Sequence, residues 1–244
     1  IMQNLIVIKV GGNALTELTA DFYQTLSAWR AQGKQILLVH GGGNEISRYA
    51  ELLQLPIIKQ DGIRVTDAET LNVTKMALMG LVQPLILQQL SAHGLPTLGL
   101  NAATNGLLLG DYLDKAKFAA VGQIQAVNQA FLQNILPHFI GVLAPLAMTA
   151  QGDWLNVNGD TAAANIATLL GAERLYLLTD VEGVLKQGKL IKTLTHSEAT
   201  ELIEQGIITQ GMQPKIAAAF SAKQGGVAQV QICGQLSVAG TQII

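Results

Sequence analysis

Residues 5–13 read LIVIKVGGN and carry the features that decide the fold. The run opens with four apolar residues, three of them β-branched, which predict a buried strand of a parallel sheet. Lys9 interrupts the run near its carboxyl end, and Gly11 and Gly12 follow it. Glycine turns expose backbone N–H groups, and open α/β sheets bind ligands at the carboxyl ends of their strands. The stretch therefore predicts a phosphate site, the alternative being a tight turn that binds nothing.

The composition is unusually apolar. Of 244 residues, 49% are hydrophobic and 13% are charged, whereas soluble chains usually carry about 25% charged residues. We expect an aliphatic sheet that is covered by helices on both faces, with some apolar surface buried by self-association. No run of about 18 apolar residues occurs, so we expect no membrane span, and we find no signal-peptide pattern.

The charge and the cysteine usage exclude other classes of protein. A net charge of -2 argues against a nucleic-acid binder, which would show a basic stripe. Cys233 is the only cysteine, which suits a reducing cytoplasm and leaves no disulfide or cysteine metal site. The histidines are scattered without metal-ligand spacing, so we expect no protein-bound metal centre.

The pattern of strand, glycine turn and helix occurs twice near the start of the chain. After the first turn, residues 21–32 predict a helix. A second strand over 35–39 is followed by HGGGN at 40–44 and a helix over 45–53. Because parallel strands end at the same edge of a sheet, both glycine turns would face one crevice.

The rest of the pattern predicts one continuous α/β sheet with two lobes that divide near residues 160–172. No linker or fixed-period repeat separates the elements. The predicted elements that matter below are a hairpin around Asp61-Gly62, helices over 68–80 and 84–92 with Thr66 or Asp67 as the first N-cap, a single strand over 139–146, a helix over 162–171 capped by Asp160 or Thr161, and a helix over 213–224.

A second lysine stands where a helix disfavours it. Lys215 lies in the first turn of the helix predicted over 213–224, whose amino end is already positive, at a cost of about 0.3–1 kcal/mol. A bound anion beside that turn would resolve the conflict. The alternative is an exposed lysine on a solvated face. Lys9 and Lys215 are therefore the candidate anion-binding cations.

Residues 156–160 read NVNGD and form a further candidate site. Asn156 and Asn158 stand two apart on an extended segment, so both side chains would point to one face. Two amides could bind an oxyanion, or a carboxylate and an amide, without adding charge. Asp160 opens the following helix, and a plain N-cap would explain it equally well. For the two asparagines the alternative is a polar turn.

Arg64 lies in the predicted hairpin between apolar neighbours. Its guanidinium fork suits a carboxylate bound through two parallel hydrogen bonds. The alternative is a surface salt bridge with Asp61 or Asp67, worth about 0–1 kcal/mol. No metal cage is visible, although Asp180 and Glu182 could approach a magnesium–nucleotide complex indirectly, because magnesium takes few protein ligands.

Six motifs stand in the order seen in the amino acid kinase family, which the chain resembles over essentially its whole length. They are residues 9–12 KVGG, 40–43 HGGG, 62–66 GIRVT, 156–160 NVNGD, 179–184 TDVEGV and 211–215 GMQPK. The resemblance implies a three-layer αβα sandwich around a mainly parallel central sheet, with two lobes. The N-lobe, about 1–165, would bind an acyl amino acid and dimerise, and the C-lobe, about 166–244, would bind a nucleotide.

The motifs look most like those of family members that transfer the γ-phosphoryl group of ATP to the side-chain carboxylate of N-acetyl-L-glutamate in arginine biosynthesis. The resemblance implies ATP and Mg²⁺ as cofactors, N-acetyl-L-glutamate as partner, and a cytoplasmic homodimer that binds neither nucleic acid nor membrane. Lys9 and Lys215 would stabilise the transferred phosphoryl group, and Asp160 would orient both lysines. Transfer between two anions needs positive charge and preset amides rather than a nucleophilic side chain.

The other roles that the resemblance implies are binding roles, with no protein ligand to a metal. The acceptor would be held by Gly42, Gly43, Arg64, Asn156 and Asn158. The nucleotide would contact Gly11, Gly12, Asp180, Val181, Glu182, Gly183, Val184, Leu185, Ile207, Ile208 and Thr209.

Departures from the family pattern leave alternatives open. Gly159 stands where alanine is common, and residues 100–105, LNAATN, lack the usual Ser-Gly-Lys-Asp-like loop. The chain begins at the first strand, which would favour a dimer that arginine does not inhibit. One alternative is a related kinase for another acceptor such as N-acetyl-aminoadipate, whose extra methylene is worth about 1–3 kcal/mol in a pocket. The other is a non-catalytic sensor of a nucleotide or an amino acid.

Overall fold

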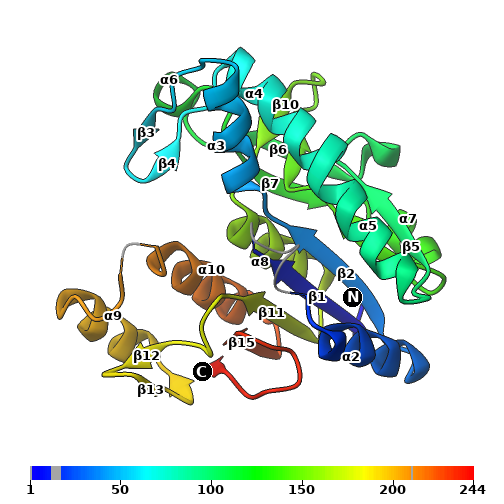
Figure 1. The fold of residues 1–244 in the computed structure, drawn as a ribbon, viewed down its shortest axis with the longest axis vertical. Helices are drawn as coiled ribbons and strands as arrows, with labels where there is room; N and C mark the ends of the chain where they lie inside the picture. Colours follow the sequence, from blue (N-terminus) through cyan, green and yellow to red (C-terminus); the bar gives the residue numbers. More distant parts are fainter. Residues whose placement is uncertain (1, 12–17, 210) are drawn as a thin grey trace.

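An eight-stranded sheet forms the centre of the part of the chain that the computed structural model describes, residues 2–11, 18–209 and 211–244 (Figure 1). The strands from β15 to β5 run parallel, and β16 runs antiparallel to β15. The prediction of a mainly parallel central sheet is confirmed. In spatial order the strands are β14 Thr193–Leu194, β16 Thr241–Ile243, β15 Gln229–Cys233, β11 Arg174–Leu178, β1 Leu5–Val10, β2 Gln35–His40, β8 Ile140–Leu143 and β5 Thr97–Leu100.

β1 lies between β11 and β2, and the carboxyl ends of the three strands are level. Val10 pairs with His40 at the end of β2, and Lys9 pairs with Leu177 near the end of β11. The N–H of Gly41 donates to the carbonyl of Val10 at 2.9 Å. The two strands that precede the glycine-rich stretches therefore end at the same edge of the sheet, as the sequence predicted.

Successive side chains of β1 point to opposite faces of the sheet and enter two different cores. Ile6 and Ile8 belong to one buried cluster, and Leu5 and Val7 belong to the other. Helices cover both faces, so the αβα sandwich is confirmed. The first cluster is closed by α2 Ala20–Ala31 and α5 Gln83–Ala92, and the second by α7 Gln129–Ile135, α8 Gly159–Leu170, α9 His196–Glu204 and α10 Gln213–Gln224.

Smaller elements lie at the two ends of the view in Figure 1, with β3, β4 and α6 at one end and β12, β13 and α9 at the other. In the described chain, a four-stranded sheet contains β10 Trp154–Asn156, β9 Leu146–Met148, β6 Leu108–Tyr112 and β7 Gly122–Val127. The paired short strands are β3 Lys59–Gln60 with β4 Ile63–Arg64, and β12 Leu185–Lys186 with β13 Lys189–Leu190. Further helices are α3 Gly43–Leu52, η2 Thr104–Gly106 and α6 Lys115–Phe118.

The hairpin that carries Arg64 follows from its turn residues. Asp61 and Gly62 have φ angles of 52° and 78°, which is the pattern of the type I′ turn that matches the twist of its flanking strands. The prediction of a hairpin is confirmed. The helix after it begins with Asp67 as N-cap, because its carboxylate accepts the N–H of Thr70 at 2.8 Å.

The prediction of two separate helices over 68–80 and 84–92 is wrong. The chain winds without a break through α4 Ala68–Lys75, the π-helical segment η1 Met76–Val82 and α5. Pro84 has no N–H, and its ring would clash with the carbonyl four residues earlier in α-helical winding. The wider π-helical winding just before Pro84 lets the helix continue past it.

This continuous helix, Ala68–Ala92, is long and apolar enough to cross a membrane by length and composition, with a mean hydropathy of 1.3. The hydropathy refers to an 18-residue window of this helix, and 44% of that window is buried inside the protein. Core helices meet the same two criteria, so the helix alone is weak evidence for a membrane span.

The prediction of a single strand over 139–146 is also wrong. The segment forms β8 of the central sheet and β9 of the four-stranded sheet, with Pro145 between them. Proline cannot donate to a sheet ladder, and the N–H of Leu146 instead donates to the carbonyl of Ala144 at 2.8 Å. This bend connects the central sheet to the segment that leads to Asn156.

A threonine in β16 anchors the excursion between β11 and α9. Thr241 is fully buried, and its hydroxyl accepts the N–H of Val184 at 2.8 Å and donates to the carbonyl of Ile191 at 2.6 Å. Both partners lie far from Thr241 in the sequence.

Thr241→Val should destabilise the protein by about 1–3 kcal/mol, because it leaves the buried N–H of Val184 and the carbonyl of Ile191 without their partner. Urea unfolding followed by circular dichroism measures the change. Thr200→Val is the control, since the hydroxyl of Thr200 is exposed and bonds only to the carbonyl of His196 in its own helix. Equal unfolding midpoints for the two variants would contradict the anchoring role of the Thr241 hydroxyl.

Candidate functional site

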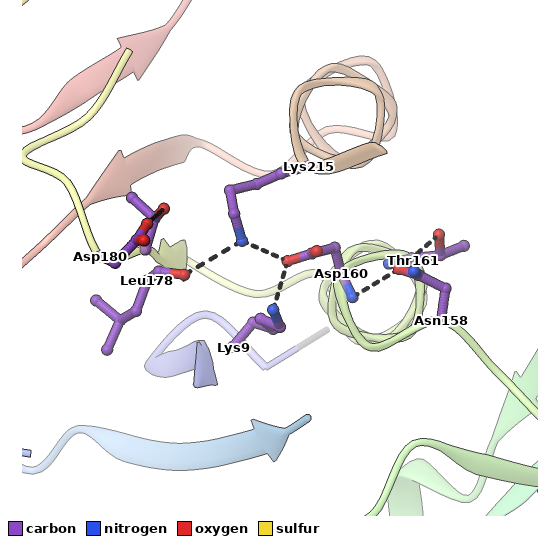
Figure 2. Close-up of polar contacts among 8 residues, drawn as sticks. Lys9, Asn158, Asp160, Thr161, Leu178, Asp180 and Lys215 are labelled. Atoms are coloured by element: carbon purple, nitrogen blue, oxygen red, sulfur yellow. Dashed lines mark hydrogen bonds and ion pairs between the residues drawn. The ribbon is translucent and has the colours of Figure 1, made fainter. Parts of the chain in front are cut away.

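Two buried lysines from distant parts of the sequence meet at one carboxylate. Lys9, 8% exposed, and Lys215, 7% exposed, each place their Nζ against Oδ1 of Asp160, at 3.1 Å and 2.8 Å (Figure 2). The prediction that the two lysines share one site is borne out by this geometry. The alternative of an exposed, solvated Lys215 is wrong.

The central sheet and two helices bring the three groups together. Lys9 stands near the carboxyl end of β1, and Lys215 lies in the first turn of α10. The Nζ of Lys215 also donates to the carbonyl of Leu178, at 3.2 Å, where the neighbouring strand β11 ends (Figure 2). Asp160 lies in the first turn of α8, so the site is built at the carboxyl edge of the sheet.

The charges of this group do not cancel. Burial raises the pKa of Asp160, but the ammonium groups of Lys9 and Lys215 more than offset burial and hold that pKa below its ordinary value. Burial lowers the pKa of Lys215, against the attraction of Asp160. One carboxylate faces two lysines, so the arrangement favours a further anion beside it.

Asn158, rather than Asp160 or Thr161, caps helix α8. Its Oδ1 accepts the N–H groups of Asp160 at 3.0 Å and of Thr161 at 3.1 Å (Figure 2). The predicted caps are therefore wrong. Asparagine is among the best N-cap residues, which is the sequence signal that would have identified it. Because Asn158 takes the capping role, the Asp160 carboxylate is free to bind the lysines.

A pocket of about 1110 Å³ opens beside this group, and three helices point their amino ends into it. Gly42 and Gly43 begin α3, Asn158 begins α8, and Gln213 begins α10, and all four residues line the pocket. The amino ends of helices carry partial positive charge, so the pocket is suited to bind anions.

The pocket brings together most of the residues that the sequence predicted for the acceptor and the chemistry. Lys9, Gly42, Gly43, Arg64, Asn156, Asn158 and Asp160 line it. Lys215 and Gly11 do not line it, and Gly12 lies outside the described residues. A methyl group on Gly159 would meet the Cε of Lys9 at 3.5 Å, an ordinary contact, so glycine or alanine fits there.

Arg64 is held inside the pocket by two residues of α3. Its Nη2 donates to the hydroxyl of Ser47 at 2.7 Å and to the carbonyl of Gly43 at 3.4 Å, and its buried Nη1 has no partner within the described residues. Burial lowers the pKa of Arg64. The alternative of a salt bridge with Asp61 or Asp67 is wrong, since Asp61 pairs with Lys117 and Asp67 caps α4.

Sequence reasoning missed two side chains that hold Arg64 and Asn156, the residues predicted to bind the phosphoryl acceptor. The hydroxyl of Ser47 contacts Arg64, and the hydroxyl of Thr66 accepts the Nδ2 of Asn156 at 3.1 Å. Ser47 stands one helical turn after Gly43, so its spacing could have placed it on the same face. No local signal connects Thr66 to Asn156.

The comparison with known families now decides the class of this chain. Residues 4–234 match the Amino acid kinase family. The chain belongs to the amino acid kinase family. A protein of Lactiplantibacillus plantarum named acetylglutamate kinase is 49% identical over 243 residues, which cover 100% of this chain and 98% of that protein.

Solved structures agree with the amino acid kinase fold. A Streptococcus mutans protein superposes with a TM-score of 0.93 at 36% identity and covers 99% of both chains. The carbamate kinase of Giardia lamblia superposes with a TM-score of 0.68 over 99% of this chain and 98% of its own, and at 17% identity it is evidence for the fold alone.

Two predicted nucleotide segments of this amino acid kinase lie outside the pocket lining. They are residues 180–185 and 207–209. Val184 and Ile208 are buried in the main core, so only their backbone could reach a ligand. Asp180 stands just past the end of β11, close to the Leu178 carbonyl that Lys215 contacts (Figure 2). Residues 101–105 also do not line the pocket.

A metal ion held by the protein itself would need several His, Cys, Asp or Glu side chains close together. Within residues 2–11, 18–209 and 211–244, no three His, Cys, Asp or Glu side chains group closely enough to hold a metal ion. Asp160 already pairs with two lysines, which makes it a poor ligand for a cation.

A buried histidine stands where β2 meets the glycine turn of this amino acid kinase. His40 is fully buried, its Nδ1 lies 3.0 Å from the carbonyl oxygen of Gly41, and its Nε2 has no partner among the described residues. Burial lowers the pKa of His40 from 6.5 to about 4, so the ring is neutral in the folded protein at neutral pH.

The folded protein should therefore lose stability as the pH falls from about 6.5 towards 4, because the unfolded chain protonates His40 first. Between pH 7 and pH 5 the loss from this residue is about 2 kcal/mol. Urea unfolding at several pH values measures it. In His40→Asn this part of the pH dependence should disappear, and in the exposed control His138→Asn it should remain. If the free energy of unfolding of His40→Asn depended on pH as steeply as that of the wild-type protein, the lowered pKa of His40 would not be the cause.

Proposed function

We propose that this chain transfers the γ-phosphoryl group of ATP to the side-chain carboxylate of N-acetyl-L-glutamate. The observation that carries the proposal is the pair of lysines on Asp160 beside a pocket that also contains Arg64 and Asn156. The full-length similarity to proteins named acetylglutamate kinase supports the choice of acceptor.

The geometry suits a reaction between two anions. An oxygen of the acceptor carboxylate forms a bond to the γ-phosphorus, the bond from that phosphorus to the β–γ bridging oxygen breaks, and ADP leaves with the electron pair. No general base is needed, because the acceptor is already ionised. Positive charge must stand in place before the reaction, and Lys9 and Lys215 supply it on either side of Asp160.

Each part of the pocket has a role in this proposal. Arg64 would bind the α-carboxylate of the acceptor, and Asn156 its acetamido group. The N–H groups at the start of α3, at Gly42 and Gly43, would bind oxygens at the reacting centre. Asn158, which caps α8, would contact the acceptor through the nitrogen of its amide.

The nucleotide would lie at the carboxyl end of β11. The residues proposed to contact it are Gly11, residues 180–185 and residues 207–209, so the C-lobe, about 166–244, would bind ATP and the N-lobe, about 1–165, the acceptor. Mg²⁺ would shield the phosphate charges, held by phosphate oxygens rather than by a protein cage. The buried free thiol of Cys233 supports a location in the reducing cytoplasm.

Lys9→Met and Lys215→Met should each lower kcat by about 100–1000-fold, as the loss of a preset charge at a reacting oxygen does. A hydroxamate assay with ATP and N-acetyl-L-glutamate measures the acyl phosphate formed. Lys223→Met is the control, since Lys223 lies on α10 like Lys215 but bonds only to the carbonyl of Ala228, at 3.0 Å. Wild-type turnover in both site variants would overturn the mechanism.

The same assay tests the acceptor. With saturating ATP, the wild-type protein should prefer N-acetyl-L-glutamate to N-acetyl-aminoadipate. Equal or greater turnover of the longer acceptor would replace the proposed substrate, and nucleotide binding without any hydroxamate would indicate a sensor.

We also propose that the chain forms a homodimer through the helix Ala68–Ala92. Residues 76–92 contain no charged side chain. Met76, Gly80 and Pro84 lie four apart and are exposed, so they form an uncharged stripe on the outer face. A second copy of the chain would cover it.

Gly80→Glu should convert the dimer to a monomer, because it places a charge in the stripe. A Cβ added at Gly80 would meet no neighbouring atom within 4 Å in the subunit itself, so the fold should tolerate the substitution. Sedimentation velocity measures the mass. Leu169→Glu, at an exposed apolar residue of α8, is the control and should remain dimeric. A monomeric wild-type protein would refute this assembly.

A further inference from the structure

Thr66 is a fully buried residue between the hairpin β3–β4 and helix α4. Its N–H donates to the carbonyl of Phe118 at 3.1 Å, and its own carbonyl accepts the N–H of Ala120 at 2.8 Å. The backbone of Thr66 is therefore held on both sides, and its hydroxyl has a defined position.

The hydroxyl of Thr66 contacts both of the proposed acceptor-binding residues. It donates to the carbonyl of Arg64 at 3.1 Å, and it lies 3.1 Å from the Nδ2 of Asn156. A hydroxyl has one hydrogen to donate, and the backbone carbonyl oxygen of Arg64 accepts that hydrogen bond. Towards Asn156 the hydroxyl can therefore only accept, so the NH₂ end of the Asn156 amide must face Thr66.

The other end of the same amide then faces the pocket. The backbone N–H of Asn156 donates to the carbonyl of Ala120 at 2.8 Å, which fixes the start of the side chain. Asn156 lines the pocket, and its Oδ1 has no partner within the described residues. The pocket thus presents a hydrogen-bond acceptor at this position, beside Arg64.

We propose that Thr66 is a positioning residue that holds the Asn156 amide with its oxygen towards the pocket, and that the site thereby selects acceptors with an N–H on the α-carbon. The inference rests on the proposed function and names the group of the N-acyl amino acid that Asn156 reads. An ester in place of the amide would set one oxygen against another. Sites built to bond a donor reject analogues that lack it, by up to about 10⁴–10⁵-fold.

The test compares N-acetyl-L-glutamate with its ester analogue, (S)-2-acetoxyglutarate, as acceptors in the hydroxamate assay. In the wild-type protein, kcat/KM should favour the amide by at least about 100-fold. Thr66→Val keeps the shape of the side chain but frees the Asn156 amide to rotate. The amide-to-ester ratio should then fall by at least about 10-fold, mainly through a higher KM for the amide, with the KM for ATP unchanged.

Two variants serve as controls for the hydroxyl. Thr66→Ser retains it and should keep the wild-type ratio. Thr74→Val removes another fully buried hydroxyl, one that bonds only to the carbonyl of Thr70 at 2.7 Å in its own helix, and should leave both acceptors unaffected. Thermal unfolding of each variant shows whether it is folded.

A purely structural role for Thr66 would lower kcat/KM for both acceptors by the same factor, and that result would overturn the inference. If Thr66→Val does not fold, Thr66→Ala decides, because it removes the same hydroxyl with a smaller side chain. The amide-to-ester ratio should fall by at least about 10-fold in that variant too, and an unchanged ratio would contradict the proposal. Failure of the wild-type protein to phosphorylate N-acetyl-L-glutamate would instead overturn the proposed function itself, and the inference with it.

Discussion

One carboxylate between two ammonium groups is the interaction on which the site depends. Buried ions of like charge repel strongly and lose their hydration, so Lys9 and Lys215 could not share one buried place without a counterion. Asp160 is that counterion, and it fixes the positions of both lysines. Because it balances only one of them, positive charge is in place before an anion arrives. The same arrangement that makes the site costly to build makes it suited to phosphoryl transfer.

The parallel sheet explains why such a group can form at all. Strands β11, β1 and β2 end at one edge, so Leu178, Lys9 and the turn after His40 become neighbours. Helices α3, α8 and α10 point their amino ends at the same pocket, which adds the partial positive charge of those ends to the field of the lysines. Positive charge gathers at this edge of the sheet because the strands and helices around the pocket contribute residues that stand at their ends.

The side of the pocket that contains Arg64 and Asn156 is built differently, from smaller elements that lie outside the central sheet. The hairpin β3–β4 carries Arg64, and β10 carries Asn156. Neither segment is long enough to position a side chain alone, and contacts with Ser47 and Thr66 hold the two residues in place. In the proposed function, the chemistry would therefore depend on the rigid sheet, and recognition of the acceptor on short segments that hydroxyl groups hold together.

The sequence by itself determined the strands at the start of the chain and their parallel order, and it indicated several of the residues that the pocket brings together. Those features follow from local signals: β-branched runs, glycine turns, and Lys215 in the first turn of a helix. The continuous helix past Pro84, the bend at Pro145 and the cap at Asn158 were decided by packing, because each local pattern permits more than one structure. Only the tertiary structure decided that both lysines meet one oxygen of Asp160 and that Thr66 orients Asn156. Those contacts join segments far apart in the chain, and local sequence carries no record of a distance set by the packing of the whole sheet.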